Sequence, residues 1–253
     1  MSAVAKDGPE RDLPPGLALA WGETPASRRG PKPGYSVERI VEAAVELADR
    51  EGFAALSLPR IARRVGFTTN ALYRYVSSKD ELLVLLADAG WGPPPDSLSR
   101  IRRWRAAATA WVRAVIERYH ERPWLLSIPV RGAPVTPNLL RWLEVLLAGM
   151  AHSGLRDGDK LGCALLLDGY ARGTAALSRD LREAGTPPVQ SSAVTEFLQP
   201  RLSARGYPIL ATMLAGGRYE DTPADHDVEF GLGRILDGID ALIAQSPRRD
   251  HPR

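Results

Sequence analysis

Residues 52–83 read GFAALSLPRIARRVGFTTNALYRYVSSKDELL, and this stretch decides the expected fold. Ser57 can cap a helix over residues 58–65, and Gly66 is a typical residue for ending it. A second short helix is expected over residues 69–76. Two short helices joined by a three-residue turn that begins at a glycine have the dimensions of a helix-turn-helix, whose second helix enters the major groove of DNA. A plain helical hairpin with a solvated polar face would have the same lengths.

The polar side chains of the second helix suit contact with a nucleic acid. Thr68, Thr69 and Asn70 stand at its expected start, where free backbone N–H groups attract phosphate and short side chains can reach base edges. The next turn supplies two phenols and a guanidinium, and the following helix opens with an ammonium group. These four residues are Tyr73, Arg74, Tyr75 and Lys79.

Two further helices flank this pair. Upstream, Ile40, Ala44 and Leu47 recur at helical spacing from Ser36 onward, and a glycine follows at position 52. Downstream, Ser78 and Glu81 have the spacing of a capping box, and an apolar run follows as far as Gly90. The sequence therefore predicts a small helical domain over residues 36–91, with its helix-turn-helix at 57–76.

Residues 36–91 resemble the N-terminal DNA-binding domain of the tetracycline-repressor (TetR) family. The resemblance is carried by fixed spacings of small, aromatic and basic residues around the turn, namely Phe53, Leu56, Ser57, Gly66, Ala71, Leu72, Tyr73, Tyr75, Lys79 and Leu82. It implies base or phosphate contacts from Thr69, Asn70, Tyr73, Tyr75 and Lys79. It also implies that the start of the first helix approaches the DNA backbone. The tetracycline repressor has polar and basic residues there and this chain has Leu58 and Pro59, so Arg60 is the expected phosphate partner.

Beyond Gly92-Pro-Pro-Pro95 the chain is expected to form a second domain over residues 96–246, so that the whole protein is all-α. Asp96 is the expected cap of its first helix. The remaining apolar periodicity predicts helices over residues 97–121, 137–152, 157–183, 192–203, 208–215 and 226–244. Residues 1–35 contain six prolines and no sustained apolar period, which predicts a mostly disordered arm. Its Arg28-Arg29-Gly-Pro-Lys32 segment either reaches a neighbouring minor groove or is a solvated linker.

The last helix resembles the closing helix of the tetracycline-repressor C-terminal domain, where two helices from each subunit form a four-helix dimer bundle. Its apolar stripe is wide, and Gly231 and Gly238 allow another helix to come close. Helix 157–183 carries a comparable stripe with Gly162, Gly169 and Gly173. Helices 157–183 and 226–244 are therefore the expected homodimer interface, unless both stripes only build a monomer core.

Large aromatic side chains of the second domain are candidates for a small-molecule pocket, because ligand pockets are mostly apolar and aromatic. The candidates are Trp104, Trp111, Trp124, Trp142 and Tyr170. Aromatic residues at helical spacing are also common in ordinary cores, so both interpretations stay open. The metal-binding histidine of the tetracycline repressor has no match near Pro129, which argues for a small apolar or aromatic effector without a metal.

The charge distribution agrees with a polyanionic partner. The chain has 33 basic and 30 acidic residues, a net charge of +3. Between Arg28 and Lys79, ten basic residues face only five acidic ones. All of the positive excess therefore lies in the segment expected to read DNA, although a solvated basic face would look the same.

Several classes of protein are excluded or disfavoured. No apolar run approaches the ~20 residues of a membrane helix, the first 16 residues contain no apolar stretch of signal-peptide length, and a cytoplasmic location is expected. The lone Cys163 excludes an intrachain disulfide and a multi-cysteine zinc site. No catalytic motif, metal-ligand spacing or phosphate loop occurs, so we expect neither an enzyme nor a cofactor. The expected function is a transcriptional repressor that binds a pseudo-palindromic operator; the alternative is a helical small-molecule-binding protein whose N-terminal module docks a protein.

Overall fold

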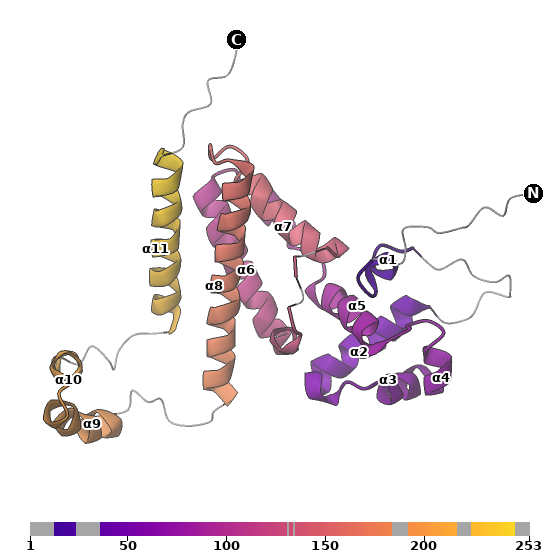
Figure 1. The fold of residues 1–253 in the computed structure, drawn as a ribbon, viewed down its shortest axis with the longest axis horizontal. Coiled ribbons are helices and arrows are strands. Elements are labelled where there is room, and N and C mark those ends of the chain that lie inside the picture. The colour runs from indigo at the N-terminus through magenta and orange to yellow at the C-terminus, as the bar shows by residue number, and fades with distance from the viewer. Residues whose placement is uncertain are drawn as a thin grey trace, which may run out of the picture. The chain divides into compact units, whose positions relative to one another are not determined.

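The computed structural model describes residues 13–23, 36–130, 132–133, 135–183, 192–216 and 224–245, and every regular element in these ranges is helical (Figure 1). The α-helices are α1 (Leu17–Ala20), α2 (Val37–Glu51), α3 (Leu58–Val65), α4 (Thr69–Leu72), α5 (Lys79–Trp91), α6 (Trp104–Glu121), α7 (Pro137–Gly149), α8 (Asp157–Glu183), α9 (Ser192–Ala204), α10 (Pro208–Ala215) and α11 (Ala224–Gln245). Three short 3₁₀ turns complete the set: η2 (Phe53–Ala55), η3 (Leu98–Arg100) and η4 (Pro123–Ser127). The all-α prediction is confirmed.

The chain divides into two compact units, Met1–His152 and Ser153–Arg253. The first unit holds α1 to α7 and the second holds α8 to α11. The sequence placed a module boundary near Gly92, whereas α6 and α7 group with the helices that precede this glycine. The reason is a set of hydrogen bonds between α5 and α7, described below.

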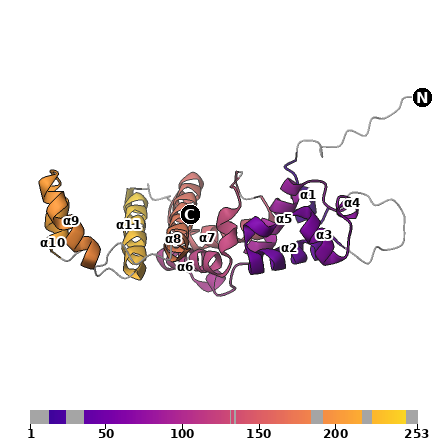
Figure 2. The same ribbon diagram turned by 90° about the horizontal axis from the view of Figure 1, so that it is seen from below.

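The core of α2 to α5 forms where α2 packs against α3 and α5, which lie close to it in Figure 2. Ile40 and Ala44 of α2, Ile61 of α3 and Leu86 of α5 are completely buried. Gly52 ends α2 in a left-handed conformation, with φ 78°. The apolar spacing read from the sequence thus predicted both the extent of α2 and the face that it buries.

Three predicted helix bounds were wrong. The helix expected over 137–152 is α7, which ends at Gly149. The second helix of the pair was expected over 69–76, but α4 ends at Leu72 and a turn follows. Asp96 was expected to cap a helix from residue 97, but α6 begins only at Trp104. Before it, Leu98 is buried in the turn η3, which packs against α7, and the backbone of Ile101 is extended. Burying Leu98 therefore takes priority over continuing one long helix.

The arm expected to be mostly disordered contains a helix. Residues 13–23 form α1 and its flanks, and α1 packs against α5. Local composition missed it because a four-residue helix is stabilised by tertiary contact and not by its own propensity. The remainder of the arm, including Arg28, Arg29 and Lys32, lies outside the described residues.

In the second unit, α8 and α11 lie side by side, and α9 packs against α10. Leu167 and Ala171 of α8, and Leu232, Leu236 and Ile239 of α11, are buried. The predicted bounds of α8 agree with the structure, and those of α9, α10 and α11 are correct to within two residues. In the part of the chain that the structure describes, no helix is both long enough and apolar enough to cross a membrane.

Candidate nucleic-acid interface

The turn between α3 and α4 is set by backbone conformation. Gly66 ends α3 with φ 79°, a left-handed value that favours glycine. The N–H of Phe67 then donates to the carbonyl of Ala62 at 2.7 Å, which closes the helix end. Thr68 opens α4, and its Oγ1 accepts from the N–H of Ala71 at 3.2 Å. Ser57 occupies the matching position before α3, but its side chain makes no capping hydrogen bond.

Two buried side chains determine which face of α4 and its following turn points outward. Leu72 and Val76 are completely buried in the core shared with α2 and α3. Thr68, Asn70 and Tyr73 are consequently exposed, and Tyr73 keeps 47% of its accessible surface. The arrangement presents short polar groups and a phenol together on one short segment, as reading base edges requires. Because α4 has only four residues, its start attracts phosphate less strongly than the start of a long helix would.

Tyr75 differs from the other predicted contacts because its ring packs against another aromatic ring. It stacks on Phe67 with ring centroids 5.5 Å apart and an interplanar angle of 16°. The stack joins the turn before α4 to the turn after it. Sequence reasoning did not single out Phe67, since an aromatic residue next to a helix-ending glycine has no distinctive pattern.

The basic residues near the interface fall into two groups. Arg60 donates to Glu51 at 2.6 Å and to the carbonyl of Ala55 at 3.3 Å, so the expected phosphate partner is tied to α2. Arg64 is likewise paired with Glu46 at 2.6 Å. These contacts hold the pKa of both Glu51 and Glu46 below the usual range of a carboxyl group, through the hydrogen bond from the facing arginine.

The second group consists of three exposed cations. Arg63, Arg74 and Lys79 form no ion pair with any described residue, and all three are exposed. Arg63 was not among the predicted contacts, although the Arg63-Arg64 doublet was a visible signal. These three residues are therefore better placed than Arg60 to meet phosphate groups.

The first turn of α5 is held by the capping box that the sequence predicted. Ser78 Oγ accepts from the N–H of Glu81 at 3.1 Å. The Glu81 carboxylate accepts in return from the backbone N–H of Ser77, one residue earlier than in the standard motif. Lys79 thereby has a fixed backbone at the start of α5.

The other end of α5 is fastened to α6 and α7. Asp88 of α5 is buried, and its Oδ1 accepts from the backbone N–H of Asn138 at 2.8 Å, which caps the start of α7. The Asn138 amide returns hydrogen bonds to the Asp88 carbonyl and to its Oδ2, each at 3.0 Å. Arg122, which directly follows α6, donates to the carbonyl of Gly90 at 2.8 Å. Helix α5, which follows the helix-turn-helix, is therefore also hydrogen-bonded to α7 and to the residue after α6.

Three of the five predicted pocket residues belong to this junction. Trp111, Trp124 and Trp142 are almost completely buried. Trp111 donates to the Trp142 carbonyl at 2.7 Å, Trp142 to the Gly92 carbonyl at 3.0 Å, and Trp124 to Asp49 Oδ1 at 2.6 Å. Each indole N–H thus has a partner within the fold, which favours a role in packing. Trp104 is half-buried at the first position of α6.

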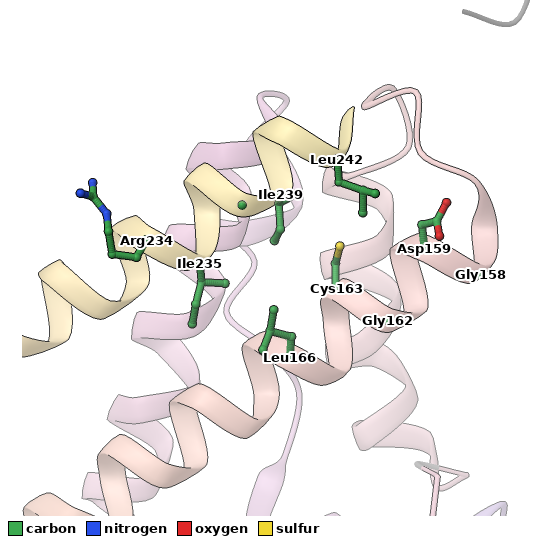
Figure 3. Close-up of a pocket in the computed structure, with 10 residues that line it drawn as sticks. Gly158, Asp159, Gly162, Cys163, Leu166, Arg234, Ile235, Ile239 and Leu242 are labelled. Atoms are coloured by element: carbon green, nitrogen blue, oxygen red, sulfur yellow. The ribbon is translucent and has the colours of Figure 1, made fainter. Parts of the chain in front are cut away.

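In the second unit, an open groove of about 510 Å³ runs between α8 and α11 (Figure 3). Cys163 and Leu166 line it from α8, and Ile235, Ile239 and Leu242 line it from α11. Burial raises the pKa of the Cys163 thiol, as suits a small apolar wall residue. The fifth pocket candidate, Tyr170, is not in the groove lining: its hydroxyl donates to the Val228 carbonyl at 2.7 Å, and its ring packs on Gly231.

Within the described ranges, no group of three or more histidine, cysteine, aspartate or glutamate residues is placed to hold a metal ion. The arrangement that remains is a short exposed reading segment, three cations beside it, and a helix linking it to a helical body. These features define a helix-turn-helix DNA-binding protein.

Comparison with known proteins identifies the family. The model of bacterial regulatory proteins of the tetR family matches residues 40–86, and that of the tetracyclin repressor-like C-terminal domain matches residues 100–243. The HTH-type transcriptional repressor DrrR1 of Streptomyces coeruleorubidus is 36% identical over 92% of this chain and 88% of its own. An HTH-type transcriptional regulator of Saccharopolyspora erythraea is 30% identical over 83% of this chain and 85% of its own.

Solved structures agree with these matches. Apo ActR from Streptomyces coelicolor superposes with a TM-score of 0.67 and 25% identity, covering 84% of this chain and all of that one. ActR in complex with actinorhodin gives a TM-score of 0.66 at 24% identity, over 84% of this chain and all of that one. The chain belongs to the tetR family of bacterial regulatory proteins, and it is a DNA-binding transcriptional regulator.

Proposed function

We propose that this protein is a homodimeric transcriptional repressor that binds a pseudo-palindromic operator through α4 and leaves it when a small molecule binds the helical body. The proposal rests on the exposed side chains of Thr68, Asn70 and Tyr73, which buried Leu72 holds in place. The exposed cations Arg63, Arg74 and Lys79 flank them. Repression is supported by DrrR1, which is named as a repressor. Control by a small molecule is supported by ActR, which has been crystallised with actinorhodin and with (S)-DNPA.

Base contacts are proposed for Thr69, Asn70 and Tyr73, and phosphate contacts for Arg63, Arg74 and Lys79. Thr68 caps α4, so its hydroxyl oxygen is shared with the Ala71 N–H. Arg60 is proposed to contact phosphate while it stays paired with Glu51. If phosphate replaced Glu51 as its partner, the Glu51 carboxylate would be left beside the DNA and would repel it.

A homodimer is proposed through α8 and α11. Leu161, Leu165 and Leu166 of α8 are all more than half exposed, which is unusual for so many leucines on one helix. Side chains built at Gly162 and Gly169 would meet nothing within 4 Å, so this face of α8 is open to a close helix neighbour. A second copy of the α8–α11 pair would cover these residues and the groove shown in Figure 3.

The effector is proposed to be small and largely apolar or aromatic, and to need no metal. Trp104 of the first unit and Tyr170 of the second unit each remain a proposed effector contact, and neither is assigned to a shared pocket. Trp111, Trp124 and Trp142 are proposed to move when the effector binds, without touching it. Their hydrogen bonds lie at the junction of α5 with α6, η4 and α7. Release then follows from population shift: the effector binds more tightly to an arrangement in which the two α4 segments are wrongly spaced for the operator.

The relatives are transcriptional regulators, which implies that the chain is not an enzyme. We place its work in the cytoplasm, where a bacterial operator is found. The alternative function, in which the N-terminal module docks a protein, predicts no strong dependence of duplex binding on salt.

Binding to duplex DNA at several salt concentrations tests the proposal. The exposed cations Arg63, Arg74 and Lys79 of each subunit predict a steep fall of the binding constant with salt, with a log–log slope of about −0.9 for each phosphate contact. The slope should fall when Lys79 is replaced by alanine. A duplex affinity independent of salt would contradict the DNA-binding assignment and favour the protein-docking alternative.

A further inference from the structure

The N-terminal segment Leu13–Glu23 contacts two separate places in the first unit, the first turn of α5 and the connection before α7. It lies outside both regions matched by the family models, which begin at residues 40 and 100. It nevertheless has a defined fold: Gly16 turns the backbone with φ 78°, and its carbonyl accepts the first helical hydrogen bond of α1, from Ala20 at 2.9 Å.

One end of the segment sits tightly on the first turn of α5. Gly16 is buried, and a Cβ built on it would lie 2.9 Å from the Glu81 carbonyl oxygen and 3.3 Å from the Glu81 Cα. Glu81 is the residue of the capping box that fixes the backbone of Lys79. The close approach of Gly16 is therefore made to the part of α5 that belongs to the DNA interface.

The other end reaches the connection before α7. The Trp21 indole N–H donates to the backbone carbonyl of Val135 at 3.0 Å. Val135 precedes Thr136, the N-cap residue of α7. The start of α7 is also hydrogen-bonded to Asp88, in the C-terminal half of α5. The contacts of residues 16 and 21 thus join the first turn of α5 to the start of α7.

We propose that Leu13–Glu23 is a strap that limits the rotation of α5 against α7 and so fixes the direction of the reading segment relative to the body. Among the described residues, the hydrogen bonds that α5 and the residue after it make with α7 lie at the C-terminal end of α5, at Asp88 and the Gly92 carbonyl. A helix fastened at one end can pivot, and a helix fastened at both ends cannot. Because a dimer must present two reading segments at one fixed spacing, limiting this pivot raises operator affinity. The proposal rests on the proposed DNA-binding function, but its structural half can be measured without DNA.

Two substitutions remove the two ends of the strap separately in the full-length protein. Gly16→Val places a branched side chain at a left-handed residue and against the Glu81 backbone, so it should detach α1. Trp21→Phe keeps an aromatic ring and removes only the N–H donor. Val135→Ala is the matched control, since it keeps the backbone carbonyl that accepts the hydrogen bond. None of these residues belongs to the buried core of α2 to α5.

Amide hydrogen exchange gives the first readout. Gly16→Val should speed exchange at least about threefold in residues 79–86 and 136–140 and leave residues 157–171 of α8 unchanged. Trp21→Phe should act in the same places more weakly, and Val135→Ala should have no effect. Unchanged exchange in 79–86 and 136–140, or an equal rise in α8, would overturn the strap.

Binding to the duplex that the unmodified protein retains from a random pool gives the second readout. Gly16→Val should weaken this binding roughly fivefold and leave binding to a scrambled duplex unchanged. Faster exchange with unaltered binding to the retained duplex would overturn the positioning role. If the unmodified protein retains no specific duplex, the proposed function fails, and the exchange data still decide whether the strap exists.

Discussion

Tyr75 is the residue for which the structure most changes the expected role. The resemblance to the family implies a contact with base or phosphate, but its ring stacks on Phe67 at 5.5 Å. A stacked ring at this place fixes the short α4 segment from both sides. We therefore interpret Tyr75 as a residue that positions Tyr73 and Thr69, with its hydroxyl contributing little.

Substitutions of the stacked pair separate these roles. Tyr75→Phe keeps the ring and should leave operator affinity within about twofold. Tyr75→Leu and Phe67→Leu each remove the stack and should weaken binding about three- to tenfold, as expected for loss of an aromatic pair. The double substitution should cost no more than either single one, since both remove the same interaction. A large loss in Tyr75→Phe, measured by mobility shift, would instead assign the hydroxyl to the DNA.

Substitutions in the exposed face distinguish base contacts from phosphate contacts. Thr69→Ala and Tyr73→Ala should each weaken binding to the operator by ~1–3 kcal/mol and change scrambled duplex little. Lys79→Ala should weaken binding to both duplexes alike and reduce the salt slope by about 0.9 for each subunit, or about 1.8 for the dimer. Titrations against the two duplexes measure this. Equal losses on both duplexes for all three variants would contradict the assignment of Thr69 and Tyr73 to base edges.

At the scale of helices, α3 is attached to α2 by charge as well as by its apolar face. Arg60–Glu51 and Arg64–Glu46 both span the two helices at 2.6 Å. The pKa of each carboxyl group is lowered in the folded protein by its arginine. A lowered pKa means that the unfolded chain binds protons more readily, so the pairs stabilise the fold at neutral pH and this contribution disappears as the pH falls below about 4.5.

Glu46→Gln and Glu51→Gln should therefore lower the melting temperature slightly at pH 7, and the difference from the unmodified protein should shrink as the pH falls below about 4.5. Glu42→Gln is the matched control: Glu42 is exposed on α2 and forms no ion pair with any described residue. Thermal unfolding followed by circular dichroism between pH 7 and about pH 3.5 measures the effect. A difference that grows towards acid pH would contradict the interpretation.

Sequence patterns predicted the helices whose ends are set by local chemistry. The α2 end at Gly52, the α3 end at Gly66 and the Ser78–Glu81 capping box all depend on residues within one turn of each other. Patterns failed where distant contacts decide. The start of α6 depends on burying Leu98 against α7, and α1 exists because it packs on α5.

The candidate site was predictable to a similar degree. The exposed residues Asn70, Tyr73, Arg74 and Lys79 were read from the sequence together with the turn that presents them. The pairing of Arg60 with Glu51 joins residues nine positions apart on different helices, and the Phe67–Tyr75 stack depends on the angle between two turns. Spacing alone contains neither relation, so the sequence could predict neither the Arg60–Glu51 pair nor the Phe67–Tyr75 stack.

For the whole molecule, the proposed homodimer depends on the surface of α8 and α11. The exposed leucines of α8 and the open groove beside α11 are the surfaces that a second copy would bury. A dimer also explains why a reading segment as short as α4 suffices, because two half-sites are read together.

Leu165→Glu combined with Leu166→Glu should convert the dimer to a monomer, because four charged side chains would enter one apolar interface. Ile209→Glu on α10 is the matched control, since Ile209 is as exposed as Leu165 but lies outside the two helices. Light scattering after size exclusion gives the mass. If the double variant keeps twice the chain mass of 27.5 kDa, α8 is not the interface.

The most direct test of the account is to sequence the DNA duplexes that the purified protein retains from a random pool. A dimer that reads DNA through α4 should retain an inverted repeat. The two half-sites should be centred one helical turn, about 34–36 Å, or a multiple of this distance apart. Tyr73→Ala should lose preference at defined positions of each half-site. A pool that shows no enriched sequence, or a single half-site without its inverted copy, would contradict a dimer that reads DNA through α4.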